Sequence, residues 1–89
     1  MKPRIHKFYL DAAATTVLHV SPAAQIIDVH AQANMVCIWM IVPDNQRAPV
    51  VFTCVNTGQD IPDDAGRYIG TAHLHAGNTV VHVFAGAPL

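Results

Sequence analysis

The chain has 89 residues and a mass of 9.6 kDa, which is too short for two separate hydrophobic cores and indicates a single domain over residues 1–89. Its net charge is −1 and its few Lys and Arg residues form no basic groove, which argues against nucleic-acid binding. No apolar run is long enough to be a membrane span or a signal peptide, so we expect a cytoplasmic protein without a membrane partner.

Apolar residues make up 52% of the chain and alternate with polar ones along most of it, between clusters of turn-forming residues. This pattern predicts an all-β fold, a small antiparallel sandwich or barrel of about six to seven strands. One short helical turn is expected near residues 60–65, capped by Asp60 and ended by Gly66. The predicted strands are Arg4–Leu10, Thr15–Val20, Ala24–Gln32, Met35–Val42, Pro49–Val55, Arg67–His75 and Thr79–Phe84.

The third and fourth predicted strands form a hairpin if Ala33-Asn34 is a two-residue loop, which places Asp28, His30 and Cys37 on one face. A thiol beside an imidazole that a carboxylate orients is the arrangement of a thiolate nucleophile. The flat strand surface offers no oxyanion donor or pocket, so the alternative is a strand with one polar face. We expect Cys37 and the other cysteine, Cys54, to be buried and reduced, because both lie in apolar runs without CxxC spacing.

Trp39 is predicted to share that polar face with Ile26 and Ile41. A large aromatic side chain among polar residues indicates that something covers it, and aromatic residues are enriched at the centres of interfaces. The low charged fraction, 12%, and the small size of the chain also favour a homo-oligomer. We therefore expect Trp39 to contact another subunit, a ligand or the second sheet.

Three histidines, His73, His75 and His82, lie near the C-terminus. A two-residue Gly77-Asn78 loop would place His82 opposite His73 and all three imidazoles on one face, where they could bind zinc with one position open for water. This would give a metal-binding protein or a metal-dependent hydrolase. The alternative is a strand with polar His residues and no cofactor, because the hairpin has no carboxylate to orient a metal-bound imidazole.

Several short motifs occur in order along the chain: His6–Leu10, Ile38-Trp39, Thr57-Gly58, Ile61–Asp64, Tyr68–Thr71 and Val80–Phe84. In this combination they resemble a family of small uncharacterised proteins common in tailed-phage genomes and prophages. The resemblance covers most of the chain and implies a small phage accessory protein in the host cytoplasm. It supplies no catalytic residues. Trp39 and His82 fall on shared positions, whereas His73 and His75 depart from the pattern.

The last predicted hairpin also carries features of its own. Gly70 within a strand indicates a bulge or a close backbone approach, and Tyr68 with Phe84 supplies a large apolar area. Arg67 either holds an anionic ligand or forms a surface ion pair with Asp63 or Asp64, and we favour the ion pair.

These residues together predict a non-enzymatic binding protein, a homo-oligomer that holds a small molecule or a protein ligand. The expected ligand-binding or interface residues are Trp39, Arg67, Tyr68, His82 and Phe84. Many small phage proteins with compact β-rich folds act by sequestering something, so a more specific hypothesis is a counter-defence protein that binds a nucleotide-type signal.

Overall fold

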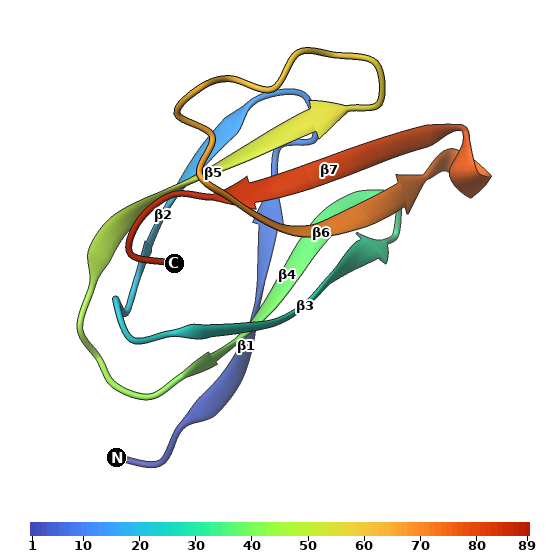
Figure 1. Cartoon of the computed structure of the whole chain (residues 1–89). Coiled ribbons are helices and arrows are strands. Elements are labelled where there is room, and N and C mark those ends of the chain that lie inside the picture. The colour runs from blue at the N-terminus through green and yellow to red at the C-terminus, as the bar shows by residue number, and fades with distance from the viewer.

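The computed structural model describes residues 1–89, which form two antiparallel sheets (Figure 1). The predicted all-β class and the antiparallel sandwich are confirmed, and each predicted strand end lies within one residue of the observed one. The strands are β1 (Arg4–Leu10), β2 (Thr15–Val20), β3 (Gln25–Gln32), β4 (Met35–Val42), β5 (Ala48–Asn56), β6 (Arg67–Leu74) and β7 (Thr79–Ala85).

The smaller sheet has the strand order β1-β4-β3, and the larger sheet has the order β2-β5-β7-β6. Within them, β3–β4 and β6–β7 are hairpins whose strands pair directly. The two sheets pack against each other, and β3 lies beside β6, where one edge of each sheet meets the other (Figure 1). Each sheet therefore has one inner face and one outer face.

The hydrophobic core lies between the two inner faces. Because side chains alternate along a strand, every second residue of β4 and β5 points inward. Ile38 and Met40 on β4, and Val50 and Phe52 on β5, are completely buried. The residues between them lie on the outer faces, and the candidate functional groups must be sought there.

The β3–β4 hairpin has the predicted two-residue loop. Ala33 and Asn34 have φ angles of 53° and 59°, the left-handed values that a type I′ turn needs at both positions. His30 consequently pairs with Cys37, as predicted. The local sequence was sufficient here because a two-residue loop determines the register of the whole hairpin.

A bulge in β3 changes the position of two isoleucines. The register shifts between Ile26 and Asp28, so Ile27 is the extra residue. Ile26 packs against the core, whereas Ile27 is 44% exposed. The prediction that Ile26 shares the outer face with Trp39 is therefore wrong, because the bulge reverses the alternation at this point.

The predicted register of the β6–β7 hairpin is wrong. The hairpin is closed by the four residues His75–Asn78, so that Leu74 pairs with Thr79 and His73 pairs with Val80. The histidine that was expected opposite His73 instead pairs with Thr71. His75 lies in the loop and not in β6, which ends at Leu74.

Contacts within the tip and beyond it explain this longer loop. Residues His75–Gly77 form a short 3₁₀ turn with positive φ angles, and the N–H of Asn78 donates to the carbonyl of His75 at 3.1 Å. The N–H of His75 donates to Oδ1 of Asn34, at the tip of the β3–β4 hairpin, at 3.1 Å. A contact between two separate hairpins cannot be deduced from the Gly77-Asn78 dipeptide.

Both features predicted at Gly70 are confirmed. The register of β6 and β7 shifts between Tyr68 and Gly70, which marks a bulge. A Cβ atom on Gly70 would lie only 2.7 Å from Cβ of Val29 on β3. Gly70 thus allows the edges of the two sheets to approach each other.

The segment between β5 and β6 contains no helix. At the position of the helical turn predicted near residues 60–65, the N–H of Ala65 donates to the carbonyl of Pro62 at 3.0 Å and closes a simple turn. Gly66 follows with φ of 95°, and any Cβ there would clash with the backbone carbonyl of Ala85, so the segment runs against the end of β7. The short turn at His75–Gly77 is the only helical element, and no helix has the length and apolar character needed to cross a bilayer.

Candidate ligand-binding site

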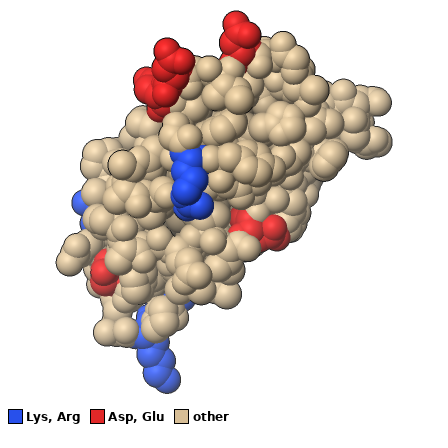
Figure 2. All heavy atoms as spheres, in the orientation of Figure 1, with Lys and Arg blue, Asp and Glu red and all other residues tan.

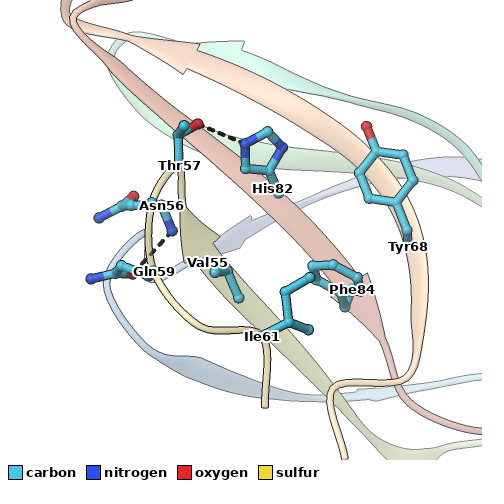
Figure 3. Close-up of a pocket in the computed structure, with 9 residues that line it drawn as sticks. Val55, Asn56, Thr57, Gln59, Ile61, Tyr68, His82 and Phe84 are labelled. Atoms are coloured by element: carbon cyan, nitrogen blue, oxygen red, sulfur yellow. Dashed lines mark hydrogen bonds between the residues drawn. The ribbon is translucent and has the colours of Figure 1, made fainter. Parts of the chain in front are cut away.

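The outer face of the larger sheet carries a pocket of about 320 Å³ beneath the start of the β5–β6 segment (Figure 3). This volume lies at the lower end of the range for small-molecule sites, roughly 300–1,000 Å³. The pocket is lined by Val55, Asn56, Thr57, Gly58, Gln59, Ile61, Tyr68, His82 and Phe84.

Two aromatic rings form the wall on the side of the sheet. Tyr68 on β6 and Phe84 on β7 are cross-strand partners, with ring centroids 5.7 Å apart and planes inclined by 66°. This edge-to-face arrangement is favourable for an aromatic pair. Tyr68 is 54% exposed, so its ring is open to a ligand. Ile61 reaches from the loop toward Phe84 and completes the apolar part of the pocket (Figure 3).

The loop side of the pocket is held by hydrogen bonds. The N–H of Thr57 donates to the carbonyl of Val80 at 3.1 Å, and the N–H of Gln59 donates to the carbonyl of Asn56 at 3.0 Å. The side-chain oxygen of Gln59 accepts from the N–H of Asn56 at 3.0 Å. Between them Gly58 has φ of 94°, a value that favours glycine. These bonds fix the loop against the end of β5 and against β7.

A chain of side-chain hydrogen bonds crosses the pocket. Nε2 of His82 lies 2.8 Å from Oγ1 of Thr57, and its Nδ1 lies 3.1 Å from Oγ1 of Thr71. The hydroxyl of Thr71 is also 2.6 Å from that of Tyr68. Each hydroxyl can both donate and accept, so the chain satisfies both ring nitrogens of His82. The pocket therefore has fixed polar groups beside its aromatic wall.

The structure brings Tyr68, His82 and Phe84 together and leaves the other two predicted site residues elsewhere. Arg67 turns toward the C-terminal segment, where its Nε donates to the carbonyl of Leu89 at 2.9 Å. It lines a separate, open cavity of about 370 Å³. The ion pair that we favoured between Arg67 and the nearby aspartates does not form, because its guanidinium is held by the C-terminal segment instead.

Trp39 lies on the outer face of the smaller sheet, whereas the pocket lies on the larger sheet. The ring of His30 stacks on Trp39, with centroids 4.3 Å apart and planes inclined by 17°. Nδ1 of His30 lies 2.7 Å from Oδ2 of Asp28, which is the only ion pair in the structure if the imidazole is protonated. This carboxylate holds the imidazole over the indole ring.

Other side chains extend this outer face across all three strands of the smaller sheet. Lys7 on β1 donates to Oε1 of Gln32 on β3 at 2.5 Å, and its ammonium group lies 4.9 Å from the centre of the Tyr9 ring. A hydrogen bond to Tyr9 raises the pKa of Lys7 above its ordinary value. Ile5 is 64% exposed at the end of the same face, which combines apolar and charged groups without a hollow.

The three C-terminal histidines are not gathered into one cluster. His75 lies in the 3₁₀ turn, His73 is exposed beside Val80, and His82 is held by two threonine hydroxyls. Nowhere does the structure bring together three or more His, Cys, Asp or Glu side chains that could hold a metal ion. The two-residue loop on which the zinc interpretation depended is absent, and the geometry gives that interpretation no support.

The cysteines are free and buried, as predicted. Cys37 lies between its strand neighbours Tyr9 and His30 and is completely covered, with Sγ 3.6 Å from the carbonyl of Met35. Burial, followed by the nearby charge of Asp11, raises the pKa of Cys54 to about 11. The arrangement of imidazole and carboxylate is present next to Cys37, but the thiol is not accessible to a substrate.

Sequence reasoning missed the loop side of the pocket, notably Thr57, Gln59 and Ile61. Thr57 is paired with a histidine 25 residues away in the chain, and this separation has no local signature. Ile61 did carry a signal in the sequence, since it is an apolar residue in an acidic turn. In the structure its side chain is 58% exposed. An isolated exposed apolar residue is common on protein surfaces, so that signal gained meaning only beside Phe84.

Comparisons with known proteins add one relationship. Neither the curated proteins nor the solved structures include a match to the chain. A family model described as a domain of unknown function, DUF7352, matches residues 1–88. Because this match spans nearly the whole sequence, the chain belongs to the DUF7352 family.

Proposed function

We propose that the protein is a non-enzymatic binding protein that holds a small molecule in the pocket between Tyr68, Phe84 and Ile61. The observation that carries this proposal is the pocket of about 320 Å³, which combines an aromatic wall with a fixed row of polar groups. Ligand sites in proteins typically combine apolar lining with a few placed hydrogen-bonding groups.

The polar groups of the pocket support binding more than catalysis. The hydroxyl of Thr57 lies 2.8 Å from His82, a distance that would suit a nucleophile and its general base. The other ring nitrogen, however, meets the hydroxyl of Thr71 rather than a carboxylate. A carboxylate is the group that stabilises the imidazolium formed during such a reaction. The same contacts suit donors and acceptors on a bound ligand.

A phage accessory role agrees with this proposal. The resemblance of its motifs to those of tailed-phage and prophage proteins supports a protein that works in the cytoplasm of an infected cell by sequestering a ligand. In a counter-defence role the ligand would be a nucleotide-type signal, whose base could stack on Tyr68 or Phe84. Its phosphate would need a separate cation, because no Lys or Arg lines the pocket.

We further propose that a second copy of the chain covers the outer face of the smaller sheet. Lys7 and Asp28 are the cross-strand neighbours of Trp39 on its two sides. A twofold axis that runs parallel to β4 above Trp39 would therefore bring Lys7 of each copy toward Asp28 of the other. The rings of Tyr9 and Trp39, together with the side chain of Ile5, would supply the apolar part of this interface.

Calorimetric titration with adenosine, cyclic AMP and cyclic GMP tests the binding function. We expect at least one of them to bind, and Phe84→Ala to weaken binding by about 5- to 150-fold, because base stacking on one aromatic ring is worth about 1–3 kcal/mol. Val80→Ala is the matched control, since Val80 lies on the same strand and face but outside the pocket.

Thermal unfolding of both variants confirms that each is folded at the titration temperature. Binding that survives in folded Phe84→Ala would place the ligand elsewhere. Absence of heat from all three compounds would reject the nucleotide-type ligand.

A further inference from the structure

We infer that the ligand of the Tyr68–Phe84 pocket is an organic cation, an ammonium group attached to an apolar body. The inference rests on the proposed binding function and names the class of ligand that the site takes. Three properties of the pocket lead to it: carboxylates on the loop that covers it, the absence of basic side chains from its walls, and two inclined aromatic rings.

The loop that covers the pocket carries three carboxylates. Asp60 stands between Gln59 and Ile61, both of which line the pocket, and neighbouring Cα atoms are about 3.8 Å apart. Asp63 and Asp64 follow within the same segment, and all three aspartates are exposed and form no ion pair. Acidic atoms gather at the end of the molecule where this segment lies (Figures 1 and 2).

No basic side chain offsets these carboxylates at the pocket. Arg67 is adjacent to Tyr68 in the sequence, but it is bonded to the carbonyl of Leu89 and lines a different cavity. The remaining basic residues are Lys2, Arg4 and Lys7, in or before β1 of the other sheet, and Arg47, in the β4–β5 segment. A cation in the pocket would therefore meet no basic side chain in the lining, and a phosphate would find none to pair with.

The aromatic wall adds a favourable contact for the same charge. A ring attracts a cation placed over its face, because the face of the π system is electron-rich. Tyr68 and Phe84 are inclined by 66°, so their faces form two sides of a corner rather than one flat stack. The exposed ring of Tyr68 and the apolar side chain of Ile61 would surround the alkyl groups of an ammonium ion. The row of hydroxyls beside them would bind a polar end of the ligand.

The test compares choline with 3,3-dimethylbutan-1-ol, which has the same shape without the charge. By calorimetry we expect choline to bind at least about five-fold more tightly than the alcohol, since a cation over an aromatic ring gains about 1 kcal/mol or more. The preference should decrease as sodium chloride is raised, because salt screens the loop carboxylates.

Two pairs of variants separate the contributions. Asp60→Asn should reduce the preference for choline, whereas Asp44→Asn should not, because Asp44 precedes β5 and the pocket loop follows the far end of that nine-residue strand. Tyr68→Leu keeps an apolar side chain but should remove part of the preference, whereas Val80→Ala, which lies outside the pocket, should not.

Equal binding of choline and the neutral alcohol at the pocket would overturn the inference and leave the binding function standing. Tighter binding of cyclic AMP than of choline would overturn it as well, and would instead support an anionic ligand. If neither choline nor the alcohol binds, the inference fails, whereas binding of adenosine or a cyclic nucleotide would still support the binding function.

Discussion

The two outer faces of the sandwich contain similar side chains in different surroundings. On the smaller sheet, His30 stacks on Trp39 and is held by the carboxylate of Asp28. On the larger sheet, His82 lies beside the Tyr68–Phe84 pair and is held by threonine hydroxyls. Each face thus has a histidine next to aromatic rings, but the groups that orient the two histidines differ in charge.

The main difference between the faces is the segment between β5 and β6. This segment folds over the larger sheet, and its residues provide one wall of a pocket (Figure 3). No comparable segment covers Trp39, where the side chains of three strands form a continuous surface. A hollow with fixed polar groups suits a small ligand, whereas a broad face with both charge signs suits another protein surface. We therefore propose ligand binding for the larger sheet and self-association for the smaller one.

Trp39→Ser should give the largest effect, because it removes the centre of the proposed subunit interface. Loss of a central aromatic residue costs about 2–4 kcal/mol, so we expect the dimer dissociation constant to rise at least about 30-fold. Sedimentation velocity over a range of concentrations measures this change. Ligand binding at the Tyr68–Phe84 pocket should remain within two-fold, taken as roughly the scatter among unrelated surface substitutions.

The matched control for this prediction is Val17→Ser, which removes an exposed apolar side chain from β2 of the larger sheet. It should leave association unchanged. A wild-type protein that stays monomeric at millimolar concentration would contradict the assignment of the Trp39 face to self-association.

Gly70→Ala should lower stability without distinguishing the two outer faces. The added Cβ would lie 2.7 Å from Cβ of Val29, so β6 and β3 must separate. Overpacking of this kind costs about 1–3 kcal/mol, measurable as a lower midpoint of denaturant unfolding. Gly77→Ala provides the comparison, because Gly77 has open space around it and only its φ of 88° opposes the change. An unchanged midpoint in Gly70→Ala would show that the sheets can separate at little cost.

The strands and the β3–β4 register could be predicted because their determinants are local. Alternation of apolar residues located each strand, and two residues with left-handed backbone determined the Ala33-Asn34 turn. The β6–β7 register could not be predicted in this way. Its loop depends on a hydrogen bond from His75 to Asn34, which lies 41 residues earlier in the chain.

The candidate site was predictable only in part for a related reason. Tyr68, His82 and Phe84 stand out in the sequence as an aromatic and polar set near one hairpin, and the structure brings them together. Arg67 was predicted in the same site because it is adjacent to Tyr68 in the sequence, and Trp39 because a large aromatic residue on a polar face indicates an interface. The topology separates them, because the strand of Trp39 belongs to the other sheet and the side chain of Arg67 turns toward Leu89.

Thr71→Val should have a moderate effect that is confined to the larger sheet. The change keeps the shape of the side chain but removes the hydroxyl that links Tyr68 to His82. Loss of a hydrogen bond of this kind costs about 0.5–1.5 kcal/mol, which denaturant unfolding can resolve. Ligand binding should weaken as well, because the ring of Tyr68 loses its anchor, while self-association should not change.

Thr79→Val makes the same chemical change on β7, outside the pocket and outside the hydrogen-bond chain. It should affect neither binding nor association. Equal loss of binding in the two variants would show that the chain from Thr57 to Tyr68 does not position the ligand.

A further prediction concerns the pH dependence of stability and the buried thiol of Cys54 on β5 of the larger sheet. Cys54 lies in the core between the sheets, and burial raises its pKa from 9.0 to about 11. Between these values the unfolded chain loses the thiol proton while the folded chain keeps it. The contribution of Cys54 to stability is therefore fully present below pH 9 and is lost as the pH rises toward 11.

Denaturant unfolding at pH 8, 9, 10 and 11 tests this prediction. The free energy of unfolding should decline more steeply with pH in wild type than in Cys54→Ala. The same slope in both proteins would mean that the Cys54 thiol titrates alike in the folded and unfolded states.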